Sequence, residues 1–212
     1  MLMTSWVQIV DLGHTAVMVP LAGAIAAWLV AARAWKAALY WCVIFAAGLG
    51  LVASSKIAFL GWGGGVPSLE FQALSGHAFR SSAVIPVSFF LLLRGASSSV
   101  RTGGVVLGVG VSIALGVLLV HFRFHTLSEV VPSLILGASV SLCFVHIAAT
   151  LPTPRWNRWA LPFSIIVLMG IYMLKPSSFN HRLVDIALYL SGRDQPYGWA
   201  RHWEREVAAC RP

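Results

Sequence analysis

The sequence predicts an all-α, polytopic membrane helix bundle with about six transmembrane helices. Of its 212 residues, 58% are hydrophobic and only 10% are charged, and the mean hydropathy is +0.80. Soluble domains are about one quarter charged, so most of this chain is solvated by something other than water. Long apolar runs are joined by short linkers whose charges alternate along the chain.

Six apolar runs supply the predicted helices. A helix rises about 1.5 Å per residue, so about 20 residues cross the hydrocarbon core, and shorter runs rely on their flanking residues. Gly and Ser are frequent in the fourth and fifth runs, where small residues let helices approach closely in lipid. In chain order, the runs are Thr15–Ala32, Ala38–Leu60, Ala78–Leu93, Gly104–Val120, Val130–Thr150 and Ala160–Leu174.

The linker charges predict an orientation. Basic residues occupy every second linker, and none of these linkers contains a carboxylate. All seven carboxylates fall on the opposite side. The positive-inside rule therefore places the basic linkers in the cytoplasm, and it places segments 61–77 and 121–129 and both termini outside. The basic linker residues are Arg33, Lys36, Arg94, Arg101, Arg155 and Arg158.

The rest of the composition narrows the class of protein. The formal net charge is +8, but the basic residues are scattered at helix ends, so membrane topology explains them better than nucleic-acid binding does. The N-terminus has no cleavable signal of the usual shape. Cys42, Cys143 and Cys210 form no zinc-binding pattern.

The last part of the chain differs from the apolar runs. Residues 1–174 form the predicted membrane-embedded unit, and residues 175–212 form an outward-facing tail with prolines, tryptophans and mixed charges. Within this tail, Leu183–Leu190 has the pattern of an amphipathic helix.

Polar residues gather at the outward ends of the apolar runs. Lys56 ends the second run and precedes a glycine-rich loop. Ser75 can cap the third helix, and a helix N-terminus favours anions. His77 then stands where it can donate a proton to a leaving alkoxide, and Arg80 lies one turn further on. An isolated lysine more often snorkels to the interface, and an interfacial histidine can lack a role.

A second polar group precedes the fifth run. His125 and Glu129 are four residues apart, so on a helical turn they share a face. A carboxylate that accepts the proton of one imidazole nitrogen fixes the tautomer and leaves the other nitrogen free to attack. Glu129 also suits a helix start, and both roles can hold together. Arg123 is a plausible phosphate clamp because its planar guanidinium matches phosphate oxygens.

At these residues the chain resembles the type-2 phosphatidic acid phosphatase superfamily of integral membrane lipid phosphatases, in a divergent bacterial branch. Lys56 matches the lysine of the first family block, Ser75-Gly76-His77 matches the second block, and His125 with Glu129 matches the end of the third. The resemblance covers about residues 11–137.

The chain departs from the family pattern at four places. The arginine of the first block is Gly63, the proline of the second block is Leu74, and the Ser-Arg pair of the third block is Leu118-Leu119. The final aspartate is Glu129. Arg80 and Arg123 are the candidates to replace the two missing arginines.

The resemblance implies a metal-independent phosphoryl transfer that needs no cofactor. His125 would attack phosphorus and form a phosphohistidine, Glu129 would orient it, and His77 would protonate the leaving oxygen. Lys56, Ser75, Gly76, Arg80 and Arg123 would bind the phosphate.

The substrate implied is a membrane lipid phosphate or diphosphate. Undecaprenyl diphosphate, phosphatidate, phosphatidylglycerol phosphate and lipid A phosphates all qualify. The implied place is the bacterial inner membrane, with the active site facing the periplasm.

Three other interpretations stay open. The same residues would serve a phosphotransferase that passes the phosphate to another lipid, or a catalytically degenerate protein that binds lipid phosphate without turnover. A haem- or metal-binding membrane protein would use paired histidines at matching depth, drawn from His77, His121, His125 and His146.

Overall fold

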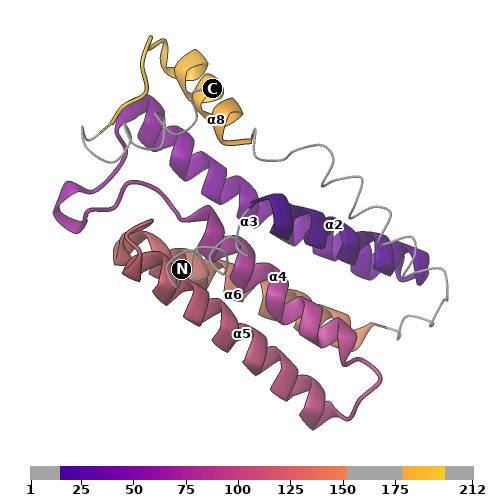
Figure 1. Ribbon diagram of the computed structural model, residues 1–212. Coiled ribbons are helices and arrows are strands. Elements are labelled where there is room, and N and C mark those ends of the chain that lie inside the picture. The colour runs from indigo at the N-terminus through magenta and orange to yellow at the C-terminus, as the bar shows by residue number, and fades with distance from the viewer. Residues whose placement is uncertain (1–14, 152–178, 199–212) are drawn as a thin grey trace.

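The computed structural model describes residues 15–151 and 179–198, and these residues form helices joined by short loops (Figure 1). This part of the chain contains no named strand, only an isolated bridge between Val66 and Phe71. The predicted all-α class is confirmed. The α-helices are α2 (Thr15–Ala31), α3 (Trp35–Trp62), α4 (Gly76–Leu92), α5 (Ser98–His121), α6 (Leu127–Thr150) and α8 (Phe179–Ser191), with a short 3-10 helix η2 (Pro67–Leu69).

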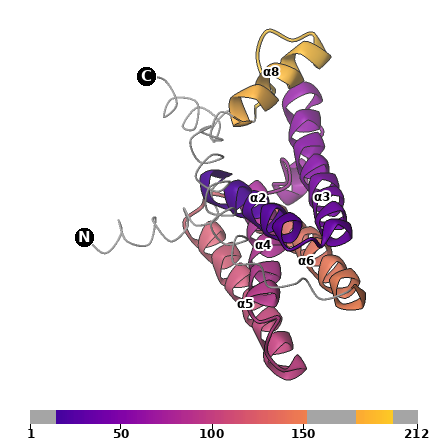
Figure 2. The ribbon, with the colours of Figure 1, turned by 90° about the vertical axis from the view of Figure 1, so that its right-hand side faces the viewer.

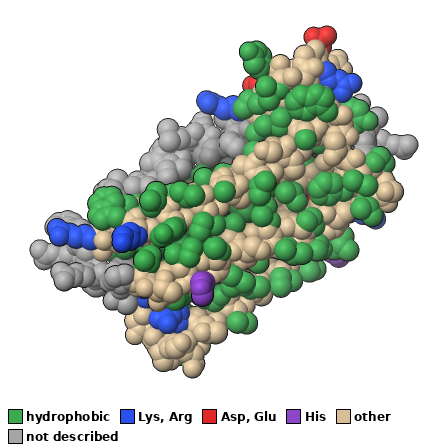
Figure 3. Space-filling view, turned by 180° about the vertical axis from the view of Figure 1, so that it is seen from behind, with side chains coloured by type: hydrophobic (Ala, Val, Ile, Leu, Met, Phe, Trp, Pro, Cys, Tyr) green, Lys and Arg blue, Asp and Glu red, His purple; other side chains and the backbone are tan. Residues whose placement is uncertain are grey.

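Three of these helices, α3, α5 and α6, are long and apolar enough to cross a membrane. Helices α5 and α6 have 24 residues each, and at about 1.5 Å per residue their length exceeds the thickness of a hydrocarbon core of about 30 Å. Two shorter helices, Val17–Ala31 and α4, are also apolar. Hydrophobic side chains cover the flank of the molecule (Figure 3). The protein is therefore a membrane helix bundle.

Each of the five predicted runs that fall in the described residues overlaps one helix. The largest difference is at α5, which begins at Ser98, six residues before the predicted Gly104. Ser97 caps this helix by accepting a hydrogen bond from the Val100 amide, so the helix starts in a polar segment that hydropathy does not mark. The predicted sixth run, Ala160–Leu174, and the linker residues Arg155 and Arg158 lie outside the described residues.

Helix α4 is the central helix, and it packs against α5 and α6. A Cβ atom on Gly137 of α6 would lie 2.4 Å from the Phe79 carbonyl oxygen of α4, so no larger residue fits between these backbones. Gly108 of α5 approaches Pro86 in the same way. The expectation that small residues in the fourth and fifth runs mediate close packing is confirmed.

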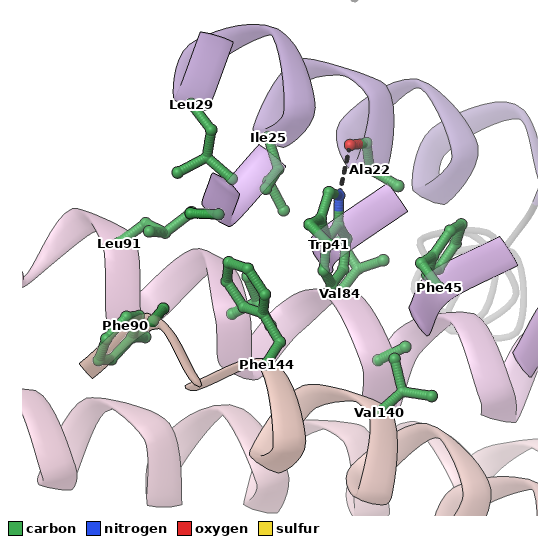
Figure 4. Close-up of a cluster of buried hydrophobic side chains, with 14 of the residues drawn as sticks. Ala22, Ile25, Leu29, Trp41, Phe45, Val84, Phe90, Leu91, Val140 and Phe144 are labelled. Carbon is green, nitrogen blue, oxygen red and sulfur yellow. Dashed lines mark hydrogen bonds between the residues drawn. The ribbon is translucent and has the colours of Figure 1, made fainter. Parts of the chain in front are cut away.

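An aromatic cluster joins α2 and α3 to this core (Figure 4). The Trp41 ring stacks on Phe45 and meets Phe144 edge-on, at centroid distances of 5.1 and 5.3 Å. The buried Trp41 Nε1–H donates to the Ala22 carbonyl at 3.0 Å, which satisfies its polar atom and fixes α2 against α3.

The two ends of the bundle differ in charge. In the view of Figure 3 the acidic side chains are confined to one end. At the other end, Arg94 and Arg101 both lie 5.6 Å from the centroid of the Phe90 ring. Burial, together with the charge of Arg101, lowers the pKa of the Arg94 guanidinium. In that view this end has basic side chains and no acidic ones.

Helix α8 packs against the last turns of α3 (Figure 2). Its Ala187 is buried with Phe59 and Leu60 of α3, and its Leu183 is also buried. The predicted amphipathic stretch Leu183–Leu190 lies within this helix.

Candidate active site

The candidate site is built around the N-terminus of α4. Ser75 is the N-cap residue, as predicted, and its side chain accepts a hydrogen bond from the Ala78 amide at 3.4 Å. Its own amide donates to Ser133 Oγ of α6 at 2.8 Å. Ser75 and Gly76 are both buried. The cap thus ties the start of α4 to α6 and leaves the positive end of the α4 dipole at this point.

His125 and Glu129 form a hydrogen-bonded pair beside this cap. His125 Nδ1 lies 2.7 Å from Glu129 Oε2. Because an ionised carboxylate only accepts hydrogen bonds, Nδ1 carries the proton and Nε2 is the free nitrogen. The spacing suggested that the two residues share a helical turn, but they do not. Helix α6 begins at Leu127, and His125 lies in the bend before it. Thr126 is the N-cap, so the chain turns between the two side chains.

The Glu129 carboxylate is held from two further directions. Its Oε1 accepts a hydrogen bond from the Gln72 amide at 3.2 Å, and its Oε2 accepts one from the Thr126 amide at 3.4 Å. The Glu129 side chain is buried, so these bonds are partly shielded from water. The carboxylate therefore has a fixed position relative to His125.

His77 faces the same pair from the first turn of α4. The centroids of the His77 and His125 rings lie 6.2 Å apart, with the rings tilted by 53°. The two half-buried imidazoles are therefore neighbours at the start of α4.

Arg80 brings a buried cation to the same helix end. It is only 5% exposed, and its Nε is buried without a hydrogen-bond partner. Within the described residues, its guanidinium forms no ion pair or hydrogen bond. A Cβ atom on Gly76 would lie 2.8 Å from Arg80 Nη1, which shows that the guanidinium folds back against the start of α4. A buried cation without a counter-charge is costly, and a bound anion would remove that cost.

The other two predicted phosphate ligands differ in placement. Lys56 is half-buried on α3, next to Ser55, whose Oγ accepts a hydrogen bond from the Leu74 amide at 3.0 Å. This bond brings the α3 turn that carries Lys56 beside the Ser75 cap. Arg123 is exposed, in a left-handed turn at φ 58°, and its side chain has no hydrogen bond or ion pair with described residues.

The two positions where the family pattern has arginines are structurally closed to them. Gly63 is the C-cap of α3 at φ 72°, a conformation that favours glycine, and a Cβ there would lie 2.7 Å from the Tyr197 ring. Leu119 is buried against Ala78 and Val130. Any cation for a phosphate must come from elsewhere in the chain.

Three residues that position the site escaped the sequence analysis: Ser55, Gln72 and Ser133. Each of them forms a hydrogen bond with a residue that is distant in the chain. Gln72 does so through its backbone amide, which every residue except proline has, so the sequence does not mark it. Ser133 also donates to the Glu129 carbonyl at 2.6 Å, so it joins the Ser75 cap to the turn that holds Glu129.

The histidines do not gather into a metal site within residues 15–151 and 179–198, where no group of three or more His, Cys, Asp or Glu side chains could hold a metal ion. His121 and His146 are both exposed.

No family model matches the chain. No solved structure matches it either. A search of curated proteins found a relative in Klebsiella pneumoniae, named "Uncharacterized 22.5 kDa protein in cps region", that is 30% identical over 156 residues. The match covers 71% of this chain and 73% of the relative. The chain belongs to the same family as this Klebsiella pneumoniae protein.

Proposed function

We propose that the protein is a membrane lipid phosphate or diphosphate phosphatase that works through a phosphohistidine on His125. One observation carries the proposal: His125 held by Glu129, the facing His77 and the buried Arg80, whose Nε has no hydrogen-bond partner among the described residues, lie at the N-terminus of α4. A nucleophile oriented by a carboxylate, a proton donor beside it and a fixed cation are the parts that phosphoryl transfer needs.

In the first step, Nε2 of His125 attacks phosphorus. The phosphorus–nitrogen bond forms as the bond to the leaving oxygen breaks, and His77 gives that oxygen a proton. Glu129 keeps the Nδ1 proton in place and stabilises the imidazolium. In the second step, His77 takes a proton from water, the water oxygen bonds to phosphorus, and the phosphorus–nitrogen bond breaks.

Charge on the transferring group is the main electrostatic problem in this reaction. The Arg80 guanidinium and the first amides of α4 supply fixed positive charge, and Lys56 on the neighbouring turn of α3 would add to it. Arg123 could reach the phosphate by rotating its exposed side chain. Loss of one such donor typically lowers the rate by a factor on the order of 10² to 10³.

The membrane setting favours a lipid substrate. The candidate site lies at one end of a bundle of apolar helices, where a phosphate headgroup meets water and a hydrocarbon tail meets lipid. We place this end on the periplasmic face of a bacterial inner membrane, because the opposite end has the basic linkers.

A second candidate function is binding of a lipid phosphate without turnover. It is favoured by Gly63 and Leu119, which close both family arginine positions. The phosphatase is preferred because Arg80 supplies a buried cation in place of the two missing arginines.

Phosphate release in detergent tests the proposal. The wild type, His125→Ala and the control His146→Ala are compared on long-chain phosphatidate and undecaprenyl diphosphate, with EDTA throughout. His146 is an exposed histidine near the C-terminal end of α6, whereas His125 lies just before the N-terminal end of that helix. We expect release by the wild type and the control, and none by His125→Ala. Binding of these lipids without any release would support the second function instead.

A further inference from the structure

We propose that an apolar rim beside His125 holds the hydrocarbon chain of the substrate and thereby sets its specificity. The rim consists of Val66, Leu69, Phe124 and Leu127, which are 42%, 63%, 51% and 64% exposed. This inference rests on the proposed function and adds to it the residues that select the substrate.

Two loops that are far apart in the chain form the rim. Leu69 ends η2 and precedes Glu70, whose carbonyl accepts a hydrogen bond from Thr126 Oγ1 at 3.1 Å. Thr126 lies between His125 and Leu127. A second bond, from the Gln72 amide to Glu129 Oε1, holds the same two segments together. The rim is therefore built on the hydrogen bonds that also orient the catalytic pair.

The position of these side chains is unusual. The exposed apolar residues on the flanks of α3, α5 and α6 face lipid, and this contact explains why they are apolar. The rim residues lie at or beyond the helix ends, in loops that would ordinarily be polar. Contiguous exposed apolar surface rimmed by polar groups marks a binding site.

The neighbouring charge indicates which ligand covers the rim. Phe124 and Leu127 flank His125, and the cation Arg80 lies in the same cluster of residues at the α4 N-terminus. A ligand that satisfies both surfaces has an anionic head and an apolar chain. A lipid phosphate whose phosphate binds at His77 and His125 would lay its hydrocarbon chain across the rim.

The test measures a ratio of two rates. The Phe124→Ser/Leu127→Ser double variant is compared with the wild type on long-chain phosphatidate in mixed micelles and on soluble p-nitrophenyl phosphate. For each protein, kcat/KM for the long-chain substrate is divided by kcat/KM for the soluble substrate. We expect this ratio to fall by at least about tenfold in the double variant, mainly because KM for the long-chain substrate rises. Leu190→Ser is the matched control, because Leu190 is an exposed (56%) leucine of α8 outside the rim. An unchanged ratio, or an equal fall in the control, would overturn the proposal.

A binding measurement separates this inference from the proposed function. If the wild type releases no phosphate from either substrate, the proposed function fails, and displacement of a fluorescent long-chain phosphatidate then tests the rim alone. The double variant should bind this probe at least about tenfold more weakly than Leu190→Ser does. Equal affinities in the two variants would overturn the rim as a chain-binding surface.

Discussion

The Arg80 guanidinium lies against Gly76, so close that a Cβ atom on the glycine would come within 2.8 Å of Nη1. The two residues are one helical turn apart, at the N-terminus of α4. Glycine at this position therefore leaves the space that lets a buried cation and the helix amides converge.

Gly76→Ala should separate phosphate binding from stability. The atom displaced is the far end of a flexible side chain, so we expect the free energy of unfolding to change by less than about 1 kcal/mol. The guanidinium must move, so phosphate release should fall at least about tenfold. Gly110→Ala in α5 is the control, because a Cβ there meets nothing within 4 Å. An active Gly76→Ala variant would contradict this role of Arg80.

Arg80→Met should have opposite effects on stability and on ligand binding. Replacing buried ionic groups with apolar side chains of similar volume is often neutral or stabilising by about 1–4 kcal/mol, so Tm should stay constant or rise. A ligand present at 100 times its Kd stabilises a protein by about 2.7 kcal/mol, and inorganic phosphate should give such a shift in the wild type but not in Arg80→Met. Thermal unfolding in detergent measures both effects. A phosphate-induced rise in Tm that survives in the variant would exclude Arg80 as a ligand.

Ser133→Ala should weaken the link between α4 and α6. The Ser75 amide would lose its 2.8 Å partner in a buried position, at a cost of about 1–3 kcal/mol. We also expect slower turnover, because Ser133 connects the cap to the Glu129 turn. Ser139→Ala is the matched control in the same helix, since Ser139 is exposed and its hydroxyl donates to the Ile135 carbonyl of the same helix. Equal Tm values for the two variants would refute the structural role of Ser133.

The orientation can be tested with single cysteines at the two ends of the bundle. Ser68 and Ser98 are both exposed, Ser68 in η2 near the candidate site and Ser98 at the start of α5. After replacement of the native cysteines, an impermeant maleimide should label Ser68→Cys in intact cells. It should label Ser98→Cys only after the inner membrane is opened. The reverse pattern would place the site in the cytoplasm.

The sequence predicted the helices well because hydropathy marks membrane-spanning segments directly. It also predicted the Ser75 cap and the pairing of His125 with Glu129, since both depend on residues close together in the chain. It misplaced the start of α5, because the Ser97 cap lies in a polar segment.

Contacts between distant segments could not be predicted in the same way. The Gln72 amide and the Ser133 hydroxyl reach partners 57 and 58 residues away, and no local pattern records such a contact. The burial of Arg80 was equally hidden, since it depends on how α4 is enclosed by its neighbours. The sequence identified Arg80 as a candidate, whereas the structure supplies the reason to prefer it to the exposed Arg123.

The most direct test of the central claim is to trap a phosphate on His125. In His77→Ala, p-nitrophenyl phosphate can still phosphorylate the enzyme, because its leaving group needs no proton, but hydrolysis of the intermediate lacks its base. We expect a burst of p-nitrophenol and, by mass spectrometry of peptides kept at alkaline pH, a phosphate on His125. A wild type that releases phosphate while no phosphohistidine forms at His125 would contradict the mechanism.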